Sequence, residues 1–130
     1  MSGTDLVGVP DIPIPSPTTP QEKTMQNIQR FAEEYFEAAV DPNRERYFSL
    51  FGDDVVVHDD GRSHHGLTAV RRWRAEVPSV RYDLREVTGT ATACKAVAAV
   101  SGDFPGSPVT LRFAFTRDVQ GKITQLDIEP

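Results

Sequence analysis

The spacing of apolar residues changes near Pro78, and this change constrains the fold more than any other feature of the sequence. Before Pro78, apolar residues recur mostly at intervals of three and four, which is typical of amphipathic helices. From Val80 onward no helical period remains, and short apolar runs alternate with turn residues. Helices followed by a run of strands predict an α+β domain, with helices over one face of a curved antiparallel sheet.

The helical part begins with one long helix. It starts at Thr19-Pro20-Gln21-Glu22, a capping box with proline at the first helical position, and it ends near Val40. Its buried face is predicted from apolar residues at helical spacing: Met25, Ile28, Phe31, Ala32, Tyr35, Phe36 and Ala39. The long helix is therefore expected to bury one face in the core.

Two shorter helices follow. Asp41-Pro42 supplies a second N-cap and a first-turn proline, and the short helix after it stops around Gly52. Its inward residues are predicted to be Tyr47, Phe48 and Phe51. A third helix runs from about Leu67 to Glu76, and Pro78 closes it. Its apolar stripe consists of Leu67, Val70, Trp73 and Val77, flanked by a solvated face of Arg71, Arg72 and Arg74.

Five strands are predicted. Val55-Val56-Val57 is a β-branched run typical of a strand, and Asp59-Asp60-Gly61-Arg62 ends it as a turn. The other four strands are predicted at residues 81–87, 92–101, 109–116 and 122–128. Gly89, residues 102–106 and Gln120-Gly121 separate these four as hairpin turns. Sequential order and short turns predict an antiparallel meander.

Residues 1–19 are predicted to be a proline-rich tail, and residues 20–130 a single folded domain. Prolines at positions 10, 13, 15 and 17 interrupt any helix and favour an extended chain. The tail either has no fixed structure or lies against a neighbouring subunit through Val9, Ile12 and Ile14. It lacks the basic start and unbroken apolar run of a signal peptide, and no segment is long enough to span a bilayer.

Charge and cysteine content exclude several classes of function. With 14 basic and 19 acidic residues the net charge is −5, so no basic field attracts nucleic acid or an anionic membrane. The single cysteine, Cys94, forms neither an internal disulfide nor a cysteine-based zinc site. We therefore expect a cytoplasmic protein with no nucleic acid and no membrane as partner.

Several motifs together resemble one family. They are Phe31 to Tyr35 on the long helix, Leu50-Phe51-Gly52-Asp53-Asp54-Val55-Val56-Val57, the Asp59-Asp60-Gly61-Arg62 turn, Gly66, Val70 with Trp73, and Gly121-Lys122-Ile123. In these features residues 20–130 resemble the nuclear transport factor 2-like superfamily, and within it the SnoaL-like and ketosteroid-isomerase-like proteins. The resemblance implies a cone, in which a bent antiparallel sheet wraps the long helix and leaves an apolar pocket for a small apolar molecule. It also implies a homodimer formed through the outer face of the sheet.

The resemblance further implies a catalytic pair. The family's steroid isomerases place a tyrosine of the first helix and a carboxylate from the turn after the first strand in the pocket. When this chain is aligned through Asp53-Asp54 without a gap, Tyr35 and Asp59 occupy those positions. A carboxylate in an apolar pocket loses hydration, so its pKa rises and it can act as a base near neutral pH. A tyrosine hydroxyl can then stabilise the enolate that forms.

One feature of the isomerases is missing from this chain. They carry a second donor, an acid on a late strand, whereas residues 111–115 contain no acid. Strand alternation places Phe113 and Phe115 on one face and Arg112 on the other, so Arg112 is not expected to replace that acid. The expected chemistry is isomerisation, aldol-type cyclisation or dehydration of a small carbonyl compound without a cofactor. The predicted ligand contacts are Trp73, Phe113, Phe115, Tyr82 and Phe51.

The catalytic pair also has a simpler interpretation. Asp59 can serve only to turn the chain, because aspartate is a common turn residue. Tyr35 can serve only as a core tyrosine whose hydroxyl is satisfied. The domain would then be a non-catalytic ligand-binding or dimeric interaction module of the same fold.

Three histidines near the turn are further candidates. His65 lies near the expected pocket rim, where it is either an auxiliary acid or base or a surface residue. A metal site there would use His58, His64 and His65, with Asp59 or Asp60 as the oxygen ligand. Zinc needs three or four converging ligands, and the sequence offers no helical pair of histidines four residues apart, so no metal is expected.

Overall fold

The structure is a computed structural model that describes the backbone of residues 20–130 and the side chains of residues 24–130. The helices are α2 (Pro20–Val40), α3 (Arg44–Phe48) and α4 (Leu67–Glu76). The strands are β1 (Phe51–Asp59), β2 (Arg62–His65), β3 (Val80–Gly89), β4 (Ala93–Gly102), β5 (Val109–Arg117) and β6 (Ile123–Glu129). The expectations for the tail at residues 1–19, for its apolar residues Val9, Ile12 and Ile14, and for the cap Thr19 lie outside the described residues.

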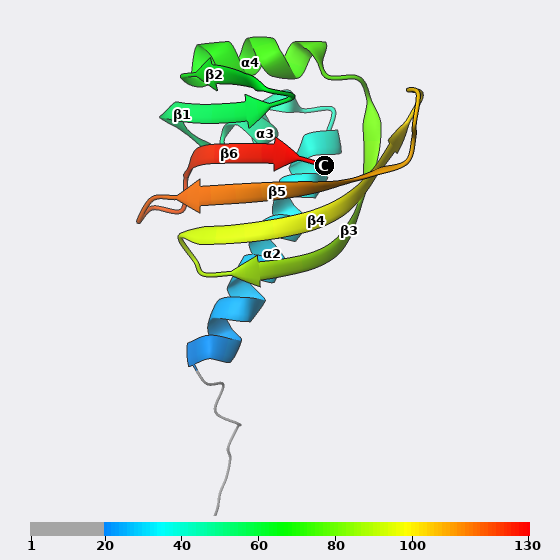
Figure 1. Ribbon diagram of the computed structural model, residues 1–130. Coiled ribbons are helices and arrows are strands. Elements are labelled where there is room, and N and C mark those ends of the chain that lie inside the picture. Colours follow the sequence, from blue (N-terminus) through cyan, green and yellow to red (C-terminus); the bar gives the residue numbers. More distant parts are fainter. Residues whose placement is uncertain (1–19) are drawn as a thin grey trace, which may run out of the picture.

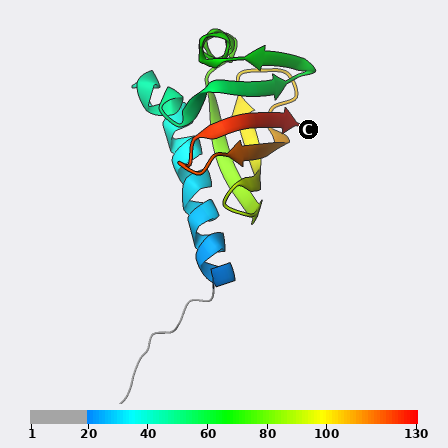
Figure 2. The ribbon, with the colours of Figure 1, turned by 90° about the vertical axis from the view of Figure 1, so that its left-hand side faces the viewer.

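The six strands form one curved, open sheet in the order β2-β1-β6-β5-β4-β3, with α2 along one side of it (Figures 1 and 2). The predicted α+β fold with a curved sheet around a long helix is confirmed, and the last four strands form the expected antiparallel meander. One pairing differs from a purely antiparallel sheet, because β6 runs parallel to β1. The strand β6 therefore joins the hairpin of β1 and β2 to the meander of β3, β4 and β5.

The strand β2 was not predicted, since its residues Arg62–His65 are polar. It forms because Asp60 and Gly61 make a two-residue turn between Asp59 and Arg62, which face each other across the hairpin. Both turn residues have positive φ, 54° at Asp60 and 75° at Gly61. Asp-Gly at such positions is the strongest short-range hairpin signal, because a type I′ turn requires left-handed backbone twice. The predicted turn thus continues into a sixth strand.

The helix α2 presents its apolar stripe to the inner face of the sheet. Phe31 packs edge-on against Phe115 of β5, with ring centroids 5.0 Å apart. Phe36 meets Phe113 of the same strand in the same way, also at 5.0 Å. Full burial of each such ring contributes roughly 1.5–3 kcal/mol to folding. These aromatic contacts fix the position of α2, and with it the position of Tyr35, which is 1% exposed.

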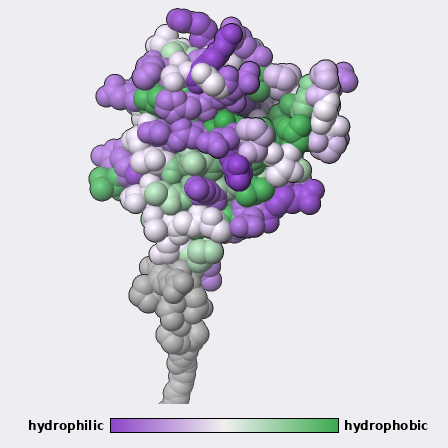
Figure 3. Space-filling view, viewed as in Figure 1, coloured by the Kyte–Doolittle hydropathy of each residue, from purple (hydrophilic) through white to green (hydrophobic). Residues whose placement is uncertain are grey.

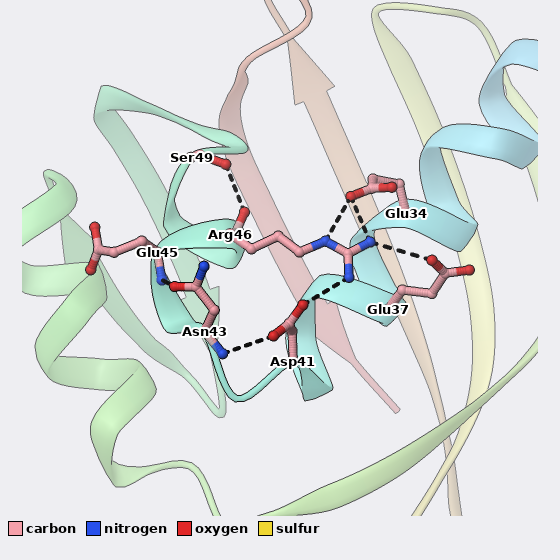
Figure 4. A network of polar contacts seen from close by, with 7 residues as sticks. All are labelled: Glu34, Glu37, Asp41, Asn43, Glu45, Arg46 and Ser49. Atoms are coloured by element: carbon pink, nitrogen blue, oxygen red, sulfur yellow. Dashed lines mark hydrogen bonds and ion pairs between the residues drawn. The ribbon is translucent and has the colours of Figure 1, made fainter.

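The short helix α3 is held on α2 by an ion-pair network centred on Arg46 (Figure 4). Its guanidinium contacts Glu34 at 2.9 Å, Glu37 at 3.3 Å and Asp41 at 3.0 Å. These side chains are partly exposed, so solvent screens each pair and each adds little to stability. The network orients α3 so that the neighbouring Tyr47 points inward, where it is buried.

The predicted N-cap at Asp41-Pro42 is wrong. Asp41 instead accepts the backbone N–H of Asn43, and Asn43 caps α3 by accepting the backbone N–H of Glu45. The Asp41 side chain thus closes a turn over residues 41–43, just before α3, as aspartate side chains readily do. The short helix also ends before Phe51, which is the first residue of β1.

The outer face of the sheet mixes hydrophilic and weakly hydrophobic residues (Figure 3). Lys95 and Arg112 are exposed there, beside the half-buried Val97 and Ala114. Among the helices at residues 20–130, none combines the length and the apolar character that a membrane crossing requires.

Candidate functional site

An inner cavity of about 200 Å³ lies between α2, α4 and the inner face of the sheet. Most of its wall is apolar, and its lining consists of Tyr35, Asp59, Trp73, Arg74, Val77, Pro78, Val80, Tyr82, Val100, Phe104, Val109, Leu111, Phe113 and Ile128. Tyr35 comes from α2 and Asp59 from the end of β1, yet both line this cavity. The two residues expected to form a catalytic pair are therefore brought to one space.

Asp59 reaches the cavity because of strand alternation. Val55 and Val57 of β1 are fully buried, and Asp59 is the next residue on the same face. Its Oδ2 accepts a hydrogen bond of 3.0 Å from Nε1 of Trp73 on α4. Its other oxygen, Oδ1, has no hydrogen-bond partner among the described residues. The indole therefore orients the carboxylate, and Oδ1 remains able to accept a hydrogen bond.

Tyr35 is joined to a second tyrosine. Its hydroxyl lies 2.9 Å from that of Tyr47, in a buried hydrogen bond in which either oxygen can be the donor. Burial raises the pKa of Tyr35 well above its usual value, and the nearby Tyr47 raises it further. Burial likewise raises the pKa of Tyr47 to about 12. Both phenols therefore keep their protons near neutral pH and act as hydrogen-bond donors.

Arg74 is the residue of the cavity that sequence reasoning missed. The expectation of a solvated face holds for Arg71 and Arg72, which are exposed, but it is wrong for Arg74, which is half-buried and lines the cavity. Arg74 lies four residues after Val70, so it follows the apolar stripe of α4. That spacing is a signal from which its position could have been found.

The predicted ligand contacts divide into two groups. Trp73, Tyr82 and Phe113 line the inner cavity. Phe115 and Phe51 do not; Phe115 packs against Tyr35 with ring centroids 4.8 Å apart, and Phe51 packs against Tyr47 at 5.0 Å. Phe115 lies two residues further along β5 than Phe113, deeper under α2. These two rings are part of the core.

The histidines lie outside the inner cavity. His65 is exposed and pairs with Val56 in the β1–β2 hairpin, on the face opposite Asp59. His58 contacts Ser63 at 2.8 Å and Asp127 at 3.7 Å on that same face. His64 lies beside Trp73, with ring centroids 5.9 Å apart. Within residues 24–130, no three His, Cys, Asp or Glu side chains converge as metal ligands would.

A second depression, of about 280 Å³, adjoins the inner cavity on the other side of Arg74. It lies where α2 ends and α3 begins, and Asp41, Arg44 and Tyr47 are among its residues. We place the candidate site in the inner cavity because its walls are mainly apolar and because both members of the predicted pair line it.

Comparison with solved structures identifies the family. A candidate polyketide cyclase from Sinorhizobium meliloti is 32% identical, with a TM-score of 0.72 over 81% of this chain and 98% of that one. A nuclear transport factor 2-like protein of unknown function from an Exiguobacterium species is 20% identical, with a TM-score of 0.63 over 76% and 96%. A candidate isomerase of the SnoaL-like family from Agrobacterium tumefaciens is 16% identical, with a TM-score of 0.63 over 80% and 97%. No protein-family model and no curated protein matches the sequence. The chain belongs to the nuclear transport factor 2-like superfamily.

Proposed function

We propose that the protein is a small enzyme that moves a proton on a small carbonyl compound in the inner cavity. Asp59 acts as the base and the Tyr35 hydroxyl as the hydrogen-bond donor to the carbonyl oxygen. The observation that carries the proposal is that these two groups, from separate elements, line one largely apolar cavity. Such a carboxylate and phenol are costly to bury unless they are used or paired.

The first step is abstraction of a proton next to the carbonyl by the free Oδ1 of Asp59. The C–H electron pair moves into the new C=C bond, and the carbonyl electrons move onto the oxygen. Tyr35 donates a hydrogen bond to that oxyanion and accepts one from Tyr47. This is the one of the two possible directions of their hydrogen bond that leaves the Tyr35 proton free for the ligand. One such donor typically lowers the barrier by about 3 kcal/mol.

The enolate then has three outcomes. Return of the proton from Asp59 to another carbon gives isomerisation. Attack of the enolate carbon on a second carbonyl, whose oxygen then takes that proton, gives aldol-type cyclisation. Departure of a β-hydroxyl together with that proton, as water, gives dehydration. Similarity to a candidate polyketide cyclase supports cyclisation among these. The cavity, at about 200 Å³, suits a single ring with short substituents, because cavities of about 150 Å³ hold benzene.

A non-catalytic ligand-binding module of the same fold is the second candidate. It is favoured by the fact that both polar groups already have protein partners, Asp59 with Trp73 and Tyr35 with Tyr47. Under this alternative Asp59 only fixes α4 to the end of β1, and no substrate is converted.

Exchange of α-protons for deuterium on cyclohexanone in D₂O, followed by NMR, separates the two candidates without knowledge of the natural product. We expect the wild-type protein to accelerate exchange and Asp59→Asn to reduce the acceleration by about 100-fold or more, the usual contribution of a general base. Asp60→Asn is the matched control, since Asp60 is an exposed neighbour and asparagine tolerates its positive φ. Equal exchange by the two variants would contradict the role of Asp59. Ligand binding without any exchange by the wild type would favour the second candidate.

We also propose a homodimer formed through the outer face of the sheet. Val97 and Ala114 give this face a weakly apolar centre between charged residues, a composition that suits a partner sheet.

A further inference from the structure

Arg74 has a role that the proposed proton transfer leaves unexplained. Its side chain lies on the inner stripe of α4, is half-buried, and forms part of the cavity wall. A guanidinium stays protonated in proteins, so Arg74 brings a permanent positive charge to this largely apolar space. Abstraction of a proton by Asp59 and donation by Tyr35 do not require that charge.

Neutral groups fix the guanidinium of Arg74 in place. One terminal nitrogen donates to the backbone carbonyl of Ala39 at 2.8 Å, and the other donates to the Tyr82 hydroxyl at 3.3 Å. The guanidinium also lies over the ring of Tyr47, 4.6 Å from its centroid. These contacts use two of the five N–H groups of an arginine side chain. The Arg74 guanidinium is therefore held in one orientation before any ligand binds, and its other N–H groups can still donate hydrogen bonds.

No carboxylate in the described part of the chain forms an ion pair with Arg74. The more exposed Arg71 and Arg85, by contrast, pair with Glu45 and Asp83. Asp59 is the acidic residue in the wall of the inner cavity, and its carboxylate is bonded to Trp73 instead. A partly buried charge without a counterion is unfavourable. The cavity is thus complementary to a ligand that supplies a negative charge.

Tyr82 extends this complementarity. Its hydroxyl oxygen accepts the hydrogen bond from Arg74, so its own hydrogen points elsewhere. Tyr82 lines the inner cavity, and within residues 24–130 no acceptor is bonded to that hydrogen. The Arg74 guanidinium and the free Tyr82 hydroxyl together match a carboxylate, because one carboxylate oxygen can accept a hydrogen bond from each of them.

We propose that Arg74 and Tyr82 bind a carboxylate on the ligand, so that the substrate is a small carboxylic acid about one ring in size. This inference names the substrate class of the proposed enzyme and in that respect rests on the proposed function. The carboxylate lies against α4 and β3, and the reacting carbonyl lies toward Asp59 and Tyr35. Arg74 is a specificity-determining residue in this arrangement.

Binding of benzoate and of benzamide, measured by calorimetry and by NMR titration, tests the proposal. The two probes have nearly the same shape and differ in charge. We expect the wild-type protein to prefer benzoate by about 10- to 100-fold, the range for a hydrogen-bonded charged group. Arg74→Met should abolish the preference. Arg72→Met is the matched control, because Arg72 is an exposed arginine of the same helix, and it should keep the full preference.

Two further variants keep the test decisive if Arg74→Met does not fold, as judged by circular dichroism. Arg74→Lys retains the charge without the fork and should keep only part of the preference, and Tyr82→Phe should weaken benzoate binding several-fold without affecting benzamide. Equal binding of the two probes by the wild type, failure to bind benzoate, or an unchanged preference in the folded Arg74 variants would overturn the proposal.

The binding assay involves no turnover, so it tests this inference separately from the proposed function. A wild-type protein that shows Asp59-dependent exchange but no preference for benzoate over benzamide would refute this inference alone. A wild-type protein that prefers benzoate through Arg74 but shows no Asp59-dependent exchange would refute the proposed function alone.

Discussion

The buried hydrogen bond between Tyr35 and Tyr47 makes a quantitative prediction about stability. Tyr35→Phe and Tyr47→Phe each remove one hydroxyl and leave the other in the interior without its partner. Leaving a buried polar group unsatisfied costs about 1–3 kcal/mol, so we expect each single variant to lose about 2 kcal/mol of unfolding free energy. For a domain of this size that loss lowers the melting temperature by roughly 8 °C.

The double variant gives the sharper test. Replacing both hydroxyls removes the unsatisfied group together with the bond, so the double variant should lose less than either single variant, at most about 1 kcal/mol, and not the sum of the two losses. Urea denaturation of the wild type, both single variants and the double variant measures this coupling. If the two losses add to within about 0.5 kcal/mol, the hydroxyls do not interact and the proposed orientation of Tyr35 by Tyr47 is refuted.

Two further predictions concern the surface. The backbone N–H of Asn43 and then Arg46 lower the pKa of the Asp41 carboxyl from 3.8, so the stability it contributes is complete above that value and lost as pH falls below it. Asp41→Asn should therefore flatten the pH dependence of the urea midpoint below about pH 4, and an unchanged profile would contradict the assignment. Light scattering should give twice the 14.4 kDa chain mass for the wild type and a single chain mass for Ala114→Arg, whereas a monomeric wild type would exclude the proposed dimer.

The sequence predicts the elements whose residues repeat with a clear period. The stripe of α2 and the alternation of β5 are long enough for Phe36 and Phe113 to be assigned to the inner side, and the structure places both there. The sixth strand, β2, lies outside such reasoning, because Arg62–His65 carries no apolar residue and depends on the turn before it. Tertiary pairing, not local preference, makes this segment a strand.

The residues of the candidate site likewise divide into those that the sequence predicts and those that it does not. Tyr35 and Asp59 were predicted from the resemblance to the family's steroid isomerases, and both line the cavity. Arg74 was assigned to the solvated face because it is charged, although its position follows the apolar stripe of α4. Its charge is accommodated by the carbonyl of Ala39 and the hydroxyl of Tyr82, groups that are distant in sequence. Such long-range partners determine whether an arginine lies inside, and a single sequence does not display them.

The parallel pairing of β6 with β1 has a consequence for assembly of the domain. The hairpin of β1 and β2 has no other neighbour in the sheet, so residues 123–129 are the joint between this hairpin and the meander. A chain cut before Ile123 would lose the middle of its sheet and separate Asp59 from the β3–β5 wall of the cavity. Completion of the inner cavity therefore waits for the strand that is synthesised last among the six.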